Sequence, residues 1–222
     1  MIHFGSWKKV DTLIVGTGIA GSALAFELQK RGASYLICTA QKSPKANTSS
    51  LSFGHCRTPS QGELKQTVEK SVSFLGENKQ RMKFVYGRAG LVQSLFEELG
   101  IEFEQRAFGI IPKGGERGGL AILRKLQGEI PSIQTETRLV GLSKKQGAFQ
   151  ALLRRNGLVS KVRAKRVVLA TGALPAASPT ATPSRSKITG SSKWFKGLEA
   201  TWQTATVSSS IPLHSTKAGK FS

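Results

Sequence analysis

The chain has 222 residues, and its 33 Lys and Arg residues against 13 Asp and Glu residues give a formal net charge of +20. Hydrophobic residues make up 39% of the sequence, which is enough for a folded core and excludes a globally disordered chain. The two cysteines are too few for a disulfide scaffold or a structural zinc cluster. We therefore expect a cytoplasmic protein without a metal site. No stretch reaches the roughly 18 apolar residues that cross a bilayer, so no membrane span is expected.

The first structural signal is a strand–helix–strand unit near the N-terminus. Residues 12–15 are an apolar run typical of a buried parallel strand, and residues 35–38 repeat that pattern. Between these runs, apolar residues recur at helical spacing until Gly32, where the helix is expected to end. Such a unit predicts two neighbouring parallel strands joined by a helix.

A glycine-rich turn joins the first strand to the helix, with the sequence Gly16-Thr17-Gly18-Ile19-Ala20-Gly21. Gly16 permits a tight turn, Gly18 lets the backbone approach a pyrophosphate, and Gly21 lets the helix pack closely on the sheet. The helix N-terminus adds unpaired N–H groups and the positive end of the helix dipole. The turn therefore predicts a dinucleotide site. The alternative is a glycine turn that binds nothing.

The acidic residue that holds a ribose in NAD-binding units of this type is missing. The second strand ends in Cys38-Thr39-Ala40-Gln41, so Thr39 is the nearest polar candidate, with Ala40 next to it. The absent acid argues against plain NAD binding and leaves a flavin dinucleotide open.

Further elements follow along the chain. Residues 41–61 are polar and are expected to form a loop. Apolar residues at helical spacing predict helices over 62–77, 91–99 and 118–126. Strands are expected over 101–104, 108–111, 133–140, 149–154, 158–162 and 167–170.

The second chemical signal is the end of the last predicted strand, Ala170-Thr171-Gly172. This strand lies about 150 residues after the glycine turn. The two motifs together look like the two halves of an FAD-binding domain, in which the strand end closes over the dinucleotide. Taken alone, the strand end is also explained by an ordinary buried strand followed by a turn.

The polar segment between the two motifs carries a family resemblance. Residues 11–172 resemble the succinate dehydrogenase/fumarate reductase flavoprotein family, and within it the L-aspartate oxidases. In that family a Ser-x-Thr-x-x-Ala-Gln-Gly-Gly loop lines the flavin. Asn47, Thr48 and Gly54 match that loop. Thr39 matches as well, because the aspartate oxidases have a hydroxyl residue at that position.

The resemblance implies an α/β fold, namely an FAD-binding Rossmann-like domain with a parallel sheet, a β-meander and helices. It also implies FAD as the cofactor. The FAD is expected to be non-covalent, because the position that bonds the flavin in membrane-bound members is Asn47 here. The cofactor-binding residues expected from the motifs and the resemblance are Gly16, Thr17, Gly18, Ile19, Ala20, Gly21, Thr39, Ala40, Asn47, Thr48, Ser49, Ser52, Gly54, Val140, Ala170, Thr171 and Gly172.

The implied activity is that of an FAD-dependent oxidoreductase with a small dicarboxylate substrate. The resemblance to L-aspartate oxidase implies oxidation of L-aspartate to iminoaspartate on the route to NAD. A fumarate reductase or succinate dehydrogenase flavoprotein fragment is the alternative. No catalytic residue is assigned, since the family's substrate-binding His and Arg residues follow the Ala-Thr-Gly strand and have no counterpart here. Lys113-Gly114-Gly115 stands where the family has a Glu-Gly-Gly-type turn.

Two other patterns have ordinary explanations. His55 and Cys56 suggest a catalytic pair, but side chains adjacent in sequence on an extended loop point apart. The basic residues between Arg154 and Arg166 could contact phosphates. Alternating charges on a hairpin are more often a solvated strand face, and no recognition motif accompanies them, so a nucleic-acid partner is not expected. A non-catalytic basic binding module that keeps the fold remains the alternative from another functional class.

The chain divides into two parts by composition. Residues 1–172 are expected to form the FAD-binding domain, with a helical insertion over about 60–127. Residues 173–222 are rich in Ser, Thr, Pro and Lys and contain one acidic residue, Glu199. Because the apolar pattern is lost at one sharp point, we expect a truncated fragment, as a reading-frame change or premature end would produce. A natural flexible tail is the alternative.

Overall fold

The computed structural model describes residues 6–76, 78–107, 109–113 and 117–172. The predicted tail over 173–222 and most of the Lys113-Gly114-Gly115 turn lie outside these residues. In chain order the elements are β1 (Lys8–Val15), α1 (Ile19–Lys30), β2 (Tyr35–Cys38), α2 (Thr48–Leu51), α3 (Gln61–Leu75), α4 (Lys79–Tyr86), α5 (Gly90–Glu98), β3 (Phe103–Arg106), β4 (Gly109–Pro112), α6 (Gly118–Gly128), β5 (Thr137–Lys145), β6 (Ala148–Arg155) and β7 (Leu158–Leu169).

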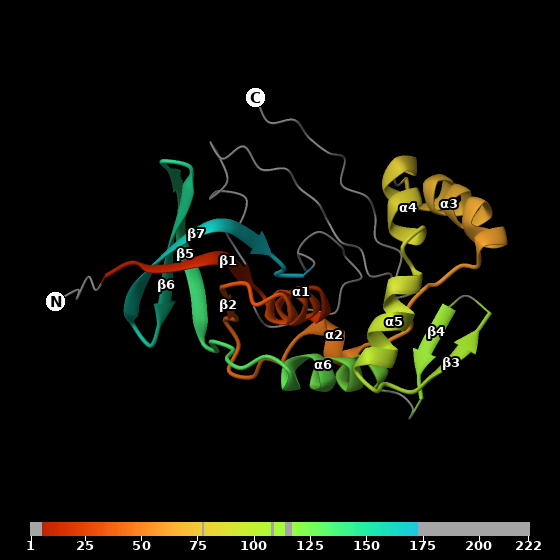
Figure 1. Cartoon of the computed structure of the whole chain (residues 1–222), viewed down its shortest axis with the longest axis horizontal. Coiled ribbons are helices and arrows are strands. Elements are labelled where there is room, and N and C mark those ends of the chain that lie inside the picture. The colour runs from red at the N-terminus through yellow and green to blue at the C-terminus, as the bar shows by residue number, and fades with distance from the viewer. Residues whose placement is uncertain (1–5, 77, 108, 114–116, 173–222) are drawn as a thin grey trace.

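A five-stranded sheet forms one end of the molecule, with the strand order β2-β1-β7-β6-β5 (Figure 1). Strands β2, β1 and β7 are parallel, whereas β7, β6 and β5 form an antiparallel meander. The helices α3 and α4 lie at the other end, with α1, α2 and α6 between (Figure 1). The expected α/β fold, with parallel strands and a β-meander, is confirmed.

Strand β7 differs from the sequence prediction, because the strands expected over 158–162 and 167–170 are one continuous strand. Charged residues interrupt the apolar pattern between them, but main-chain pairing does not require apolar side chains. One edge of β7 pairs with β6 over residues 158–164, and the other edge pairs with β1 over residues 162–169. The strand therefore links the meander to the parallel part of the sheet.

Three further elements depart from the sequence prediction. Strand β5 begins at Thr137 instead of 133, since Gln134 instead pairs beside the end of β2. Helix α4 was not predicted, because it is only eight residues long and only Met82 and Tyr86 are buried in it. Helix α2 lies within the expected loop 41–61 and is a single turn capped by Asn47, whose side-chain oxygen accepts a hydrogen bond from the Ser50 N–H.

The helices of the predicted insertion belong to two different apolar clusters. Helix α1 shares one cluster with α5, β4 and α6, which includes Phe26, Phe96, Ile110 and Ile122. Helices α3 and α4 instead pack on each other in a separate small cluster around Val68. The segment expected as a helical insertion thus contains a β-hairpin, and its last helix packs on the glycine-turn helix.

Helices α2 and α6 are joined by contacts between backbones, at positions where glycine is required. A Cβ on Gly118 would lie 2.1 Å from the Phe53 carbonyl oxygen, and one on Gly119 would lie 2.0 Å from the Ser49 carbonyl oxygen. The Gly119 N–H donates a hydrogen bond to the Ser52 carbonyl oxygen at 3.0 Å. Gly54 has φ +74 and is buried against the same helix start. These contacts fix α2 on the first turn of α6.

We predict that Gly119→Ala destabilises the domain by about 2 kcal/mol or more, because backbone atoms have to move to admit the methyl group. Gly128→Ala, at the other end of α6, is the matched control. Its Cβ would meet nothing within 4 Å, and alanine is favoured over glycine in a helix by roughly 0.5–1 kcal/mol. Urea unfolding of both variants measures the two changes. Equal stability of the two variants would contradict the packing described here.

Candidate functional site

The glycine turn brings three backbone segments into contact at the carboxyl end of β1. Gly16 has φ +115, and a Cβ there would lie 2.2 Å from the carbonyl oxygen of Ala170. A Cβ on Gly21 would lie 2.0 Å from the carbonyl oxygen of Gly16. The Ala170 N–H donates to the Val15 carbonyl oxygen at 2.8 Å, which continues the pairing of β7 with β1. The two predicted motifs therefore meet in space.

Gly18 differs from Gly16 and Gly21, because a Cβ at this position would not collide with backbone atoms. A Cβ on Gly18 would meet only the hydroxyl oxygen of Ser49, at 3.3 Å. That hydroxyl accepts a hydrogen bond of 3.1 Å from the N–H of Ile19, the first residue of α1. Within the described part of the chain, the N–H groups of Gly18 and Ala20 have no hydrogen-bond acceptor. Unpaired N–H groups at the positive end of a helix form a binding site for an anion such as a phosphate.

A cluster of hydrogen bonds, here called the polar junction, holds the turn against the loop before α2. It consists of Thr17, Ser22, Pro44, Asn47 and Gln127. The Thr17 hydroxyl donates to the Pro44 carbonyl at 2.8 Å, and the Asn47 amide donates to the same carbonyl at 2.9 Å. The Gln127 amide, from α6, donates to the Thr17 carbonyl at 3.0 Å. Two separate segments, the loop with Pro44 and Asn47 and the helix α6, are thereby tied to one side of the glycine turn.

Thr39 and Ala40 lie where β2 ends, beside the turn. Thr39 is 7% exposed, and its hydroxyl accepts a hydrogen bond from the Gln41 N–H at 3.3 Å. Its carbonyl accepts from the Thr137 N–H at 2.8 Å, which joins the end of β2 to the start of β5. Ala40 is exposed at the same edge.

The remaining predicted residues are spread more widely. Thr48 is exposed at the start of α2, and the Ser52 hydroxyl donates to the Ser49 carbonyl at 2.8 Å. Thr171 and Gly172 are exposed after the end of β7. Val140 occupies a bulge in β5, a strand separated from β1 by β6 and β7. The structure thus brings the turn, the Asn47–Ser49 segment and Ala170 together, and Val140 lies three residues after Thr137, whose N–H donates to the Thr39 carbonyl at the end of β2.

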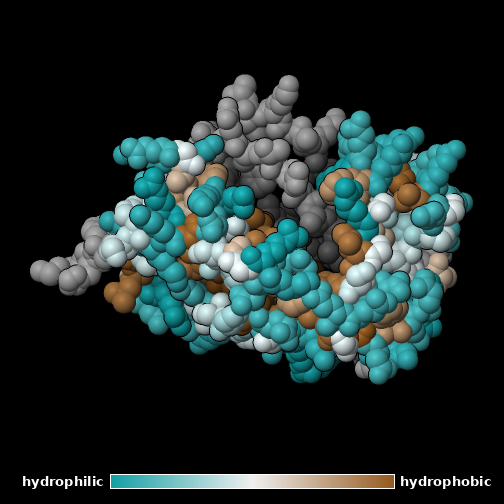
Figure 2. All heavy atoms as spheres, in the orientation of Figure 1, coloured by the Kyte–Doolittle hydropathy of each residue, from teal (hydrophilic) through white to brown (hydrophobic). Residues whose placement is uncertain are grey.

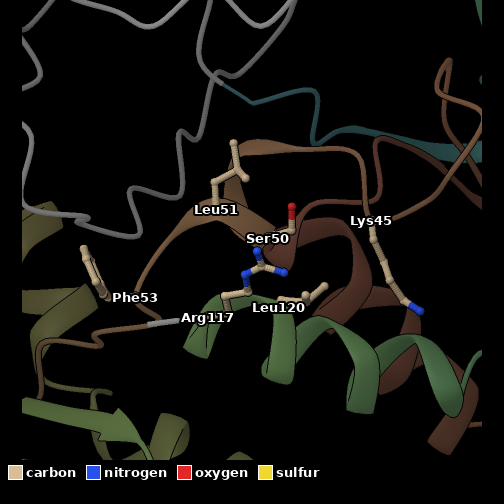
Figure 3. A pocket seen from close by; sticks show the side chains of 6 residues that line it. All are labelled: Lys45, Ser50, Leu51, Phe53, Arg117 and Leu120. Atoms are coloured by element: carbon tan, nitrogen blue, oxygen red, sulfur yellow. The ribbon is translucent and has the colours of Figure 1, made fainter. Parts of the chain in front are cut away.

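An open cavity of about 530 Å³ lies between α2 and the start of α6 (Figure 3). Figure 3 shows Arg117 extending from α6 toward α2, with Leu120 one turn further along the helix. Two of the lining side chains are cationic and none is acidic, so the cavity suits an anion with an apolar part. Its lining residues are Lys45, Ser50, Leu51, Phe53, Arg117 and Leu120.

Sequence reasoning missed two features of this region. The pair Gly118-Gly119 at a helix start was a visible sign of close backbone approach, but was not interpreted. Gln127 had no such sign, since its role depends on α6 packing beside a turn 110 residues earlier. Its Oε1 atom is buried without a hydrogen-bond partner among the described residues.

The neighbours His55 and Cys56 do not form a nucleophile–base pair. Burial raises the pKa of the Cys56 thiol to about 11, so it stays a protonated, weak nucleophile near neutral pH. The Cys56 Sγ donates to the Gly54 carbonyl at 3.4 Å, and its backbone pairs with Ile110. Burial also raises the pKa of the Cys38 thiol, to about 12. Both cysteines are core residues.

The described residues offer neither a metal site nor a membrane span. No group of three or more His, Cys, Asp or Glu side chains there is placed to hold a metal ion. No helix in the same part of the chain is long and apolar enough to cross a membrane.

The fold is similar to that of several solved oxidoreductase structures. The E. coli quinol fumarate reductase chain with an E245Q mutation has a TM-score of 0.65 and 16% identity, over 78% of this chain and 34% of that one. A flavocytochrome c3 fumarate reductase has a TM-score of 0.67 and 20% identity, over 78% and 35%. A 3-ketosteroid dehydrogenase from Rhodococcus jostii has a TM-score of 0.64 and 17% identity, over 78% and 48%. At these identities the similarity concerns the fold, and the chain spans about a third to a half of their lengths.

A protein-family match identifies the family of this chain, which the structural similarities do not. No curated protein matches the chain. The family of FAD dependent oxidoreductases, DAO, matches residues 11–131, which include the glycine turn, the Asn47–Ser49 segment and α6. Since this match spans more than half of the 222 residues, the chain belongs to the FAD dependent oxidoreductase family.

Proposed function

We propose that the chain binds FAD across the carboxyl ends of β2, β1 and β7, with the pyrophosphate on the Gly16–Gly21 turn. The observation that carries this proposal is the start of α1, where, among the described residues, the N–H groups of Gly18 and Ala20 have no acceptor and a Cβ on Gly18 would meet only the Ser49 hydroxyl, at 3.3 Å. A pyrophosphate is the anionic part of FAD, and helix N-termini of this kind bind such groups.

The residues around the turn fit the other parts of the dinucleotide. The Ser49 hydroxyl, which accepts from the Ile19 N–H, would donate its own proton to a phosphate oxygen. Thr39 and Ala40 lie at the end of β2, where the adenosine ribose is bound in folds of this type. The Ala170–Gly172 strand end and the 47–54 segment would border the flavin half.

Bound FAD would supply hydride acceptance, and the protein would supply binding and orientation of the substrate. The cavity between α2 and α6 supports an anionic substrate, because Lys45 and Arg117 line it without an acidic side chain. We propose a small dicarboxylate: L-aspartate, oxidised to iminoaspartate for NAD synthesis, in a cytoplasmic enzyme. Succinate or fumarate fits the cavity and the fold equally well.

We predict that Gly18→Val prevents retention of FAD while the domain stays folded. The valine would fill the space proposed for the pyrophosphate, but its only close neighbour is the Ser49 hydroxyl, which can rotate. Gly21→Val is the matched control, because its side chain would collide with the Gly16 carbonyl and is expected to unfold the domain. Visible absorbance of the purified proteins reports the flavin, and circular dichroism reports the fold. Equal flavin content in Gly18→Val and the parent would contradict the proposed site.

We predict that FAD is released when the loaded protein is precipitated with acid. The residue at the family's attachment position is Asn47, whose amide is not a nucleophile toward the flavin. Its side chain is also engaged in the fold, since Nδ2 donates to Pro44 and Oδ1 accepts from Ser50. The flavin absorbance of the pellet and the supernatant measures the result. Flavin remaining in a washed pellet would show a covalent bond.

We predict that Arg117→Gln raises the substrate concentration needed to reduce bound FAD by roughly tenfold or more, since charge-assisted hydrogen bonds contribute about 1.5–3 kcal/mol. The assay follows bleaching of the flavin without oxygen, with L-aspartate and succinate compared as substrates. Arg124→Gln, on the same helix but outside the cavity lining, should behave as the parent. Unchanged substrate dependence in Arg117→Gln would exclude this cavity. If the chain binds FAD but neither substrate bleaches it, the result would favour a non-catalytic binding module over the enzyme.

A further inference from the structure

The charged residues of the meander β5–β7 are all basic. Between residues 137 and 172 there is no Asp or Glu. The same stretch carries nine basic residues: Arg138, Lys144, Lys145, Arg154, Arg155, Lys161, Arg163, Lys165 and Arg166. Figure 2 shows hydrophilic side chains over this end of the molecule.

The strand register divides the meander residues between two faces. Ala151 pairs with Val162, and Leu153 lies opposite Leu139 and Ser160; Ala151, Leu153 and Val162 are buried in the core. Because side chains alternate along a strand, the residues between them point to the opposite face. That face, here called the basic face, carries Lys9 from β1, Arg138 from β5, Arg154 from β6, and Lys161 and Arg163 from β7.

Two pairs of cations lie directly opposite each other on the basic face. Arg138 of β5 lies opposite Arg154 of β6, and Lys9 of β1 lies opposite Arg163 of β7. Like charges in such positions destabilise a sheet. No ion pair between described residues neutralises Arg138, Arg154 or Arg163; the nearby Asp11 carboxylate pairs with Lys165 at 2.6 Å. Lys161 lies over the Trp7 ring, 5.6 Å from its centroid. An anionic partner would relieve this repulsion.

We propose that the basic face binds the phosphate backbone of a nucleic acid without reading its sequence. Three of the five cations are arginines, whose planar guanidinium groups form paired hydrogen bonds with phosphate oxygens. A phosphate backbone also carries an unbroken row of like charges, which suits a face whose acidic residue, Asp11, is already paired with Lys165. This goes beyond the solvated strand face expected from the alternating sequence, because only the register shows the opposed pairs.

The geometry favours this partner over a lipid surface. Peripheral binding to a bilayer combines cations with an apolar group that enters the lipid. The exposed aliphatic residue of this hairpin, Leu158, is 74% exposed but pairs with Arg155, on the other face. The apolar residues of the basic face, Trp7, Leu152 and Val159, are only partly exposed, and the Trp7 ring is covered by Lys161.

The test is fluorescence anisotropy of a labelled 20-nucleotide RNA and the corresponding single-stranded DNA with the 222-residue chain, over a series of salt concentrations. We expect Arg138→Gln/Arg154→Gln to weaken binding about tenfold or more at the lowest salt concentration. The slope of log affinity against log salt should fall by about 2, because two phosphate contacts are lost. Lys79→Gln/Lys83→Gln, on exposed positions of α4, removes the same charge elsewhere and should change binding little.

Several outcomes would overturn the proposal. These are absence of binding by the parent, equal weakening in the two double variants, or tighter binding to polyglutamate or to anionic phosphatidylserine vesicles than to the nucleic acids. Complete competition by free FAD would place the nucleic acid at the glycine turn instead of the basic face. Circular dichroism checks that the variants fold; if the arginine double variant does not, Lys9→Gln, at an exposed strand end, is compared with Lys79→Gln.

Discussion

The structure depends on one constraint: the glycine turn, the start of α1 and the end of β7 cross at distances that admit no side chain. A Cβ at Gly16 would meet Ala170, and one at Gly21 would meet the carbonyl of Gly16. This crossing sets the first turn of α1 at the carboxyl edge of the sheet. The N–H groups of that turn then face outward beside the ends of β2 and β7, where open α/β sheets bind their ligands.

A second set of close backbone contacts, between α2 and α6, positions the cavity proposed for the substrate. Gly118 and Gly119 hold α2 on α6, so Ser49 reaches the start of α1 while Ser50, its neighbour, lines the cavity. The polar junction joins both helices to the turn through Gln127. The packing of α2 on α6 therefore positions both the proposed cofactor site and the cationic cavity. A change in α6 would alter both sites.

Prediction from the sequence succeeded where the signal was local. The glycine turn, α1 and β2 follow each other directly, so their spacing and apolar pattern were enough. It failed where an element depends on distant partners. Strand β7 is continuous because β6 and β1 pair with its two edges, and Gln127 acts through a contact 110 residues away. The opposed arginines of the basic face also needed the register, since alternation alone does not say which residues are neighbours.

The central claim is that the glycine turn binds the pyrophosphate of a flavin dinucleotide. Calorimetric titration of the flavin-free chain with FAD and, separately, with FMN tests it most directly, because FMN has the flavin ring and one phosphate but neither a pyrophosphate nor an adenosine. The account predicts one FAD bound per chain and binding of FMN weaker by roughly a hundredfold or more, as the loss of several charge-assisted hydrogen bonds implies. Equal affinity for the two flavins, or no binding of FAD, would contradict it.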